Sequence, residues 1–141
     1  MNYFDAEPAI VARLKDALPE VKAILTPFSI GDMIESSQQS PTVHVIYSGD
    51  QVVSTGGQGS KTMDSQRWLI VLAVRTPKAQ LQQTGDIRVI AGEIIPKLLK
   101  ALQGWQATPE MRPLVRINGP VAGYSSSFGY FPFLFEGRLV T

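Results

Sequence analysis

The sequence predicts one α+β domain, in which an antiparallel or mixed sheet of about five strands carries two main helices. Three observations predict this fold. Residues 65–75 form an apolar run without Gly or Pro, rich in β-branched and aromatic side chains, which is typical of a strand. Residues 7–18 and 86–103 carry apolar side chains at helical spacing. The length of 141 residues suits one compact domain, so we expect a single unit over residues 1–141.

The N-terminal third contains the first helix and a short strand. Pro8 suits the first turn of a helix over residues 7–18, where a missing N–H costs nothing, and Pro19 marks its end. Residues 21–25 are a short apolar run that predicts a strand. Ser29 is placed to cap a short helix over residues 30–36.

A Gly-rich segment joins the next two strands. Residues 42–47 predict a strand, and residues 48–64 that follow are polar, with a turn expected at residues 55–60. If the flanks at residues 51–54 and 61–64 pair, the strands continue outward as a two-stranded arm. Such a ribbon is only marginally stable alone, so it stays mobile or lies against a partner. A disordered surface loop is an equally good interpretation.

The strand at residues 65–75 is apolar on both faces. Alternation places Trp68 and Ile70 on one face and Leu69 and Val71 on the other. A strand of this kind lies centrally and is covered on both sides. The covers come from the chain's own helices or from another subunit.

The second helix is the clearest element, and its apolar stripe is wide. Asp86 lies at the positive end of the helix, and Gly104 is placed to end it. Ile95 and Leu99 widen the stripe towards a second surface, which suggests a subunit contact. Pro96 removes one hydrogen bond, so we expect a kink nearby. The stripe itself consists of Ile87, Ile90, Ala91, Ile94, Leu98 and Leu102.

The C-terminal third supplies the remaining strands after polar connections. Residues 114–117 and 130–140 predict strands, and residues 121–124 a short extension. Pro132 cannot donate to a ladder, so we expect it at an edge or a bulge. One face of the last strand carries Phe131, Phe133 and Phe135.

No catalytic, cofactor-binding or metal-binding residues are expected, and we predict that the protein is not an enzyme. With no Cys and one His, a structural zinc site is excluded. His44 sits within a strand and is expected to be structural. Residues 55–62 resemble a phosphate-binding loop, but Ser60 and Thr55 stand where that motif needs Gly. Residues 123–127 fail as a nucleophile elbow because Gly is missing at the last position.

The charge pattern and the apolar runs do not favour a DNA-binding or a membrane protein. There are 13 Lys and Arg against 12 Asp and Glu, scattered along the chain, so no basic stripe for gripping DNA is visible. The N-terminus lacks the features of a signal peptide, and no apolar run reaches the roughly 20 residues that cross a bilayer.

Several segments together resemble the tail terminator proteins of long-tailed bacteriophages, in particular the branch of Mu-like prophages. The resemblance covers nearly the whole chain and depends on element order and short strings. These are residues 45–50, 66–75, 102–105, 123–124, 128 and 130–135.

The resemblance implies a structural protein that forms a ring of six copies at the head-proximal end of the virion's tail, assembled in the host cytoplasm. The ring would cap the tail tube, stop its polymerisation and offer a surface to the head-to-tail connector. Genomic DNA would pass through the lumen without specific binding, which suits the near-neutral charge. No membrane or cofactor is implied.

A closed ring uses a heterologous contact, in which one patch meets a different patch on the next copy. The candidate interface residues are those of the arm and of the widened helix stripe. They are Gln51, Val52, Val53, Thr55, Gly57, Gln58, Lys61, Ile95 and Leu99.

Three alternatives remain open at this point. One is another head-to-tail joining or tail-completion ring protein. A second is a small ligand-binding or enzymatic domain, for which Lys61 and Ser125 are the best candidate residues. A third is a DNA-binding module.

Overall fold

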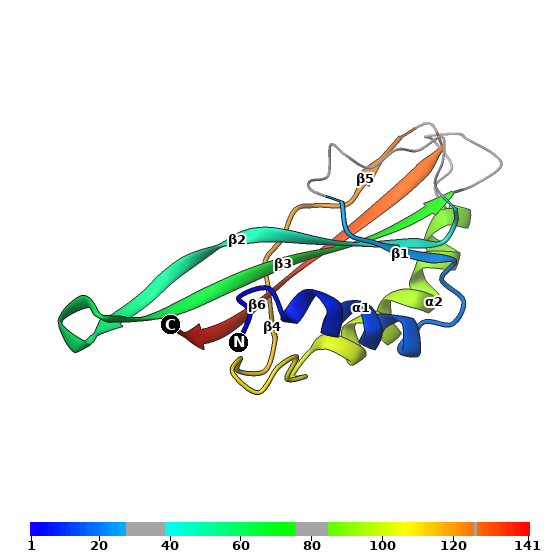
Figure 1. Ribbon diagram of the computed structural model, residues 1–141. Coiled ribbons are helices and arrows are strands. Elements are labelled where there is room, and N and C mark those ends of the chain that lie inside the picture. The colour runs from blue at the N-terminus through cyan, green and yellow to red at the C-terminus, as the bar shows by residue number, and fades with distance from the viewer. Residues whose placement is uncertain (28–38, 76–84, 126) are drawn as a thin grey trace.

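The computed structural model describes residues 1–27, 39–75, 85–125 and 127–141 of the chain. It confirms the α+β class: two helices and a six-stranded mixed sheet (Figure 1). The strand order is β1-β2-β3-β6-β4, and β5 also pairs with β6. β1 is parallel to β2, and the other pairings are antiparallel. The strands are β1 (Ala23–Leu25), β2 (Thr42–Gly56), β3 (Lys61–Arg75), β4 (Val115–Ile117), β5 (Gly123–Tyr124) and β6 (Phe128–Val140).

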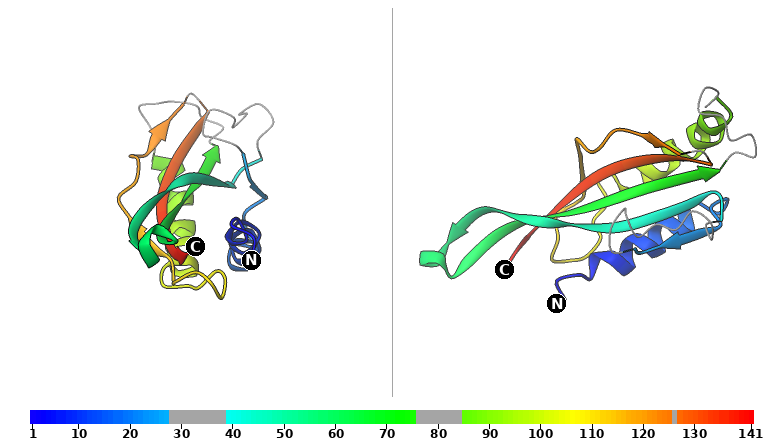
Figure 2. Two further views of the ribbon diagram at one scale, coloured as in Figure 1. Left: turned by 60° about the vertical axis from the view of Figure 1, so that its left-hand side comes forward. Right: turned by 90° about the horizontal axis from the view of Figure 1, so that it is seen from above.

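Both helices cover the same face of the sheet, α1 (Ala6–Ala17) beside β2 and α2 (Gly85–Leu102) beside β3 and β6 (Figure 2). On this face three cross-strand rows form the core. In the first row, Trp68 of β3 lies between Tyr47 of β2 and Phe135 of β6. The next two rows along the sheet likewise place an apolar residue of β3 between one of β2 and one of β6. Cross-strand aromatic and β-branched pairs of this kind stabilise a sheet. The three phenylalanines predicted to share a face are all buried in this core.

The central strand is buried on both faces within the single chain. Trp68 is fully buried, and on the opposite face Leu69 and Val71 are 6% and 2% exposed. Those two side chains form a second, smaller cluster with Ile46. Of the two sources of cover that the sequence left open, the chain itself buries both faces of this strand.

The arm exists, but it is wider than the sequence suggested. β2 and β3 pair out to Gly56 and Lys61, which confirms the hairpin and excludes a disordered loop. β6 runs beside β3 as far as the pair Met63 and Val140, so the base of the arm has three strands. Only the tip is two-stranded, as Figure 1 shows at its left. The base is three strands wide, and not the two-stranded ribbon expected from the sequence, because β6 is long enough to pair with β3 there.

The turn at the tip is a short 3₁₀ segment, η3 (Gly57–Gly59). Its three residues all have positive φ, at 55° for Gly57, 57° for Gln58 and 90° for Gly59. Glycine adopts this left-handed conformation at little cost, whereas Gln58 is strained there. The Gly-rich composition of the segment is thus a requirement of the tip geometry.

Pro132 interrupts no ladder. β4 pairs with β6 only as far as Leu134, and β5 pairs with β6 only as far as Tyr130. Between these two residues β6 is locally an edge, as predicted for Pro132. α2 continues helically through Pro96. The short helix predicted at residues 30–36 lies outside the described residues.

Candidate subunit interface

The arm presents a continuous exposed surface. Every residue from Asp50 to Lys61 is exposed, including the apolar side chains of Val52 (63%) and Val53 (43%). The structure therefore brings together all candidate interface residues predicted for this segment. They are Gln51, Val52, Val53, Thr55, Gly57, Gln58 and Lys61.

The outer edge of β2 is open along the arm. β1 pairs with β2 only at residues 42–44, and among the described residues no strand continues that pairing. An open edge offers backbone N–H and C=O groups to another chain. The edge segment from Ser48 to Gly56 contains no Pro and no Lys, the residues that usually protect such edges.

Irregularities in β2 shape the arm. The register with β3 shifts between Tyr47 and Asp50 and again between Val52 and Ser54. Gly49 lies in the first shift with a φ of 88°. Such bulges bend a strand and increase its twist. The arm is consequently turned relative to the body of the sheet, as the view from above shows (Figure 2).

Hydrogen bonds join the N-terminal residues to the base of the arm. The Tyr3 hydroxyl donates a hydrogen bond to Asp50 Oδ2 at 2.5 Å. Gln66, which is fully buried, donates to the Tyr3 carbonyl oxygen at 2.7 Å and accepts from Trp68 Nε1 at 2.9 Å. Burial, followed by the hydrogen bond to Asp50, raises the pKa of Tyr3 above its ordinary value. The phenol therefore stays protonated as a donor at neutral pH.

Aromatic packing continues this anchorage into the core. The ring centroids of Phe4 and Tyr47 are 5.0 Å apart in an edge-to-face arrangement. Tyr47 in turn lies 5.3 Å from Trp68. Pairs of this geometry contribute beyond their buried area. The base of the arm is thus held by both polar and aromatic contacts.

Hydrogen bonds also join the C-terminal residue to the β3 side of the arm. Thr62 and Thr141 exchange two backbone hydrogen bonds of 2.8 Å. The Thr141 hydroxyl also donates to Asp64 Oδ2 at 2.8 Å. The arm is therefore stiff as far as Thr62, and only the tip beyond it depends on the two-stranded pairing alone.

The helix candidates lie in a different environment. Ile95 and Leu99 are half-buried and pack against the chain's own core. The more exposed apolar residues of α2 are Val89 (66%) and Ile90 (41%). Ile90 was expected in the core stripe. The other five residues of the predicted stripe are buried, so Ile90 alone departs from the prediction. It lies at the margin of the stripe, where periodicity alone does not determine burial.

Val89 and Ile90 line a groove of about 250 Å³ at one end of the molecule. Its rim carries Glu20 and Glu93. Glu20 is paired with Lys97 at 3.1 Å. Glu93 makes no ion pair with any residue that the structure describes. The remaining lining residues are Pro41, Ile94 and Lys97.

A second groove, of about 340 Å³, lies at the β4 side of the sheet. It is lined by Arg112, Val115, Arg138 and Glu136, together with Pro113. Glu136 accepts a hydrogen bond from Ser65 Oγ at 2.8 Å and lies 3.7 Å from Arg138. The fold thus brings the side chains of Arg112 and Arg138 together at this edge, with the carboxylate of Glu136 beside them.

The described residues contain no cluster of side chains that could hold a metal ion. No helix among them is long and apolar enough to cross a membrane. His44 is buried, and burial lowers the pKa of its imidazole to about 4. Its position within β2, between apolar neighbours, is that of a structural residue. Lys61 and Ser125, the candidates for a ligand site, lie far apart in the fold, at the arm tip and beside β6.

Comparisons with known proteins agree with the fold. A family model described as "Phage tail terminator protein" matches residues 1–141. Among solved structures, 29 chains match. One is a chain of the "Virion of native gene transfer agent (GTA) particle", with a TM-score of 0.60 and 11% identity over 95% of this chain and 93% of that chain. No curated protein matches.

Proposed function

Because the chain belongs to the phage tail terminator family over its full length, we propose that it forms a ring that caps the tail tube and stops tube polymerisation. The ring, of six copies, lies at the head-proximal end of the tail. Its free face offers the attachment surface for the head-to-tail connector. The family match carries this proposal, and the exposed arm supports it.

The arm supports ring formation because it is ordered at its base yet exposed beyond it. Its backbone edge is open and its valines face solvent. Open strand edges and exposed apolar side chains promote association, so such a surface favours contact with another chain. A neighbouring copy provides that cover in a ring.

Tail length in a deletion strain tests the proposal. If the chain terminates tails, particles made without it carry overlong tubes in electron micrographs, and the restored gene returns the normal length. Normal-length tails without heads would identify a head-to-tail joining protein, the alternative ring function. Mass measurements of the purified protein, alone and with tube protein, then give the number of copies in the ring.

A further inference from the structure

We propose that, in the ring, the arm of one copy docks into the α2 groove of the next copy. This inference rests on the proposed function, because it identifies the two patches through which copies meet. The arm residues are Val52, Val53 and Lys61. The groove residues are Val89, Ile90 and Glu93.

The two surfaces match in chemistry. Each has two exposed apolar side chains, at 63% and 43% exposure on the arm and 66% and 41% on α2. Each also has one charge without an ion pair among the described residues, Lys61 on the arm and Glu93 at the groove. The charges are opposite, so contact buries apolar surface and pairs an ammonium with a carboxylate.

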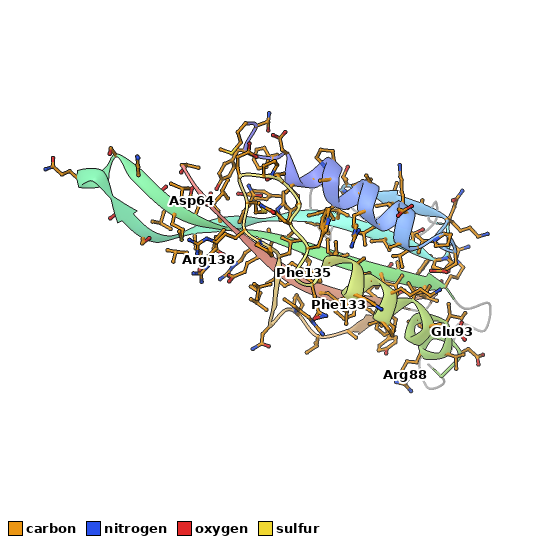
Figure 3. The ribbon with its side chains drawn as sticks, turned by 90° about the horizontal axis from the view of Figure 1, so that it is seen from below. Asp64, Arg88, Glu93, Phe133, Phe135 and Arg138 are labelled. Atoms are coloured by element: carbon orange, nitrogen blue, oxygen red, sulfur yellow. The ribbon has the colours of Figure 1, made fainter. Side chains whose placement is uncertain are left out.

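The two surfaces also lie at different ends of the molecule. Glu93 is at the α2 end, whereas Asp64 marks the base of the arm towards the other end (Figure 3). A chain therefore cannot fold its own arm into its own groove. Contact between unlike patches on successive copies is heterologous, which is the type that closes into rings.

The arm residues of the proposed contact lie on both faces of the arm. Val52 and Val53 lie where the arm is three strands wide, because Met63 and Asp64 of β3 pair with β2 on one side and with β6 on the other. Lys61 lies beyond them, in the two-stranded tip. Val52 pairs with Asp64, and Lys61 is three residues from Asp64, so the two side chains project from opposite faces of the arm.

Cysteine cross-linking tests this contact directly, because the chain contains no Cys. Purified Val53→Cys and Ile90→Cys variants are mixed, with and without tail tubes, and oxidised with copper phenanthroline. The proposal requires a covalent dimer in the mixture and none in either variant alone. Val53→Cys mixed with Val121→Cys is the matched control, since Val121 is 88% exposed elsewhere on the surface.

The outcomes separate this contact from the ring itself. Val53→Cys homodimers, or equal cross-linking to Val121→Cys, overturn the docking of arm into groove. Rings detected by mass without any cross-link overturn the docking and leave the proposed function standing. If the unsubstituted protein forms no rings and tubes made in its presence still have uncontrolled length, the proposed function is overturned.

Charge reversal gives an independent measurement. Lys61→Glu replaces attraction by repulsion and should weaken association roughly tenfold per contact. Adding Glu93→Lys should restore affinity to within about threefold of the original. Glu110→Lys makes the same charge change on another exposed carboxylate and should not restore it. Equal rescue by both variants would show a general charge effect and would overturn the proposed pairing of Lys61 with Glu93.

Discussion

Tyr3 and Asp50 join the N-terminus to the base of the arm through a hydrogen bond of 2.5 Å between the phenol and the carboxylate. The two residues are 47 positions apart, and the bond lies where the register of β2 shifts. A bulge is a place where a strand bends, so a side-chain tie at that point limits how far the arm can swing. The tie has a direct experimental consequence.

Tyr3→Phe should loosen the arm base without changing the fold. Loss of this hydrogen bond costs about 0.5–1.5 kcal/mol of the free energy of unfolding. Amide hydrogen exchange at residues 48–56 should become faster than in the unchanged protein. Tyr124→Phe removes a hydroxyl without a hydrogen bond to the described residues and serves as the control. Unchanged exchange in Tyr3→Phe would show that the bond does not restrain the arm.

The arm tip should be dispensable for folding and required for assembly. Replacing Gly56–Lys61 with Asn-Gly joins the paired residues Thr55 and Thr62 by a favoured two-residue turn. This change preserves the bonds between Thr62 and Thr141, which deletion of the whole segment 51–62 would remove. We expect a similar melting temperature and weaker ring formation by mass measurement. A shortened protein that unfolds would place the tip in the folding core.

Local signals in the sequence predicted most of the elements. The Gly-rich stretch between two strand patterns predicted the hairpin arm, because turn residues and alternation act over a few positions. The three-stranded base was not predicted, since the pairing of Met63 with Val140 depends on long-range register. The groove was missed for a similar reason. Whether Ile90 or Ile95 faces solvent depends on a small rotation of α2 that only packing determines.

Two glycines in the sheet differ in what surrounds them, which gives a test of core packing. A Cβ added at Gly129 would lie 2.5 Å from Cγ2 of Ile87, a side chain that is itself buried. Gly129→Ala should therefore lower the free energy of unfolding by about 1–3 kcal/mol through overpacking. Chemical denaturation measures this loss.

The control for that substitution is Gly123→Ala. A Cβ at Gly123 meets no atom within 4 Å, although Gly123 lies on the neighbouring strand. Its stability should stay close to that of the unchanged protein. Equal losses at both positions would show that backbone freedom, and not the contact with Ile87, is what matters at Gly129.

His44 should make the fold sensitive to acid. Burial lowers the pKa of its imidazole from 6.5 to about 4 in the folded chain, so between these values the unfolded chain binds more protons. Stability from this group is complete above pH 6.5 and falls as the pH drops towards 4, by up to about 3 kcal/mol. Denaturation between pH 4 and 7 measures the slope. His44→Gln cannot titrate, so its curve should be flatter over that range. Parallel curves for the two proteins would assign the acid sensitivity to carboxylates elsewhere.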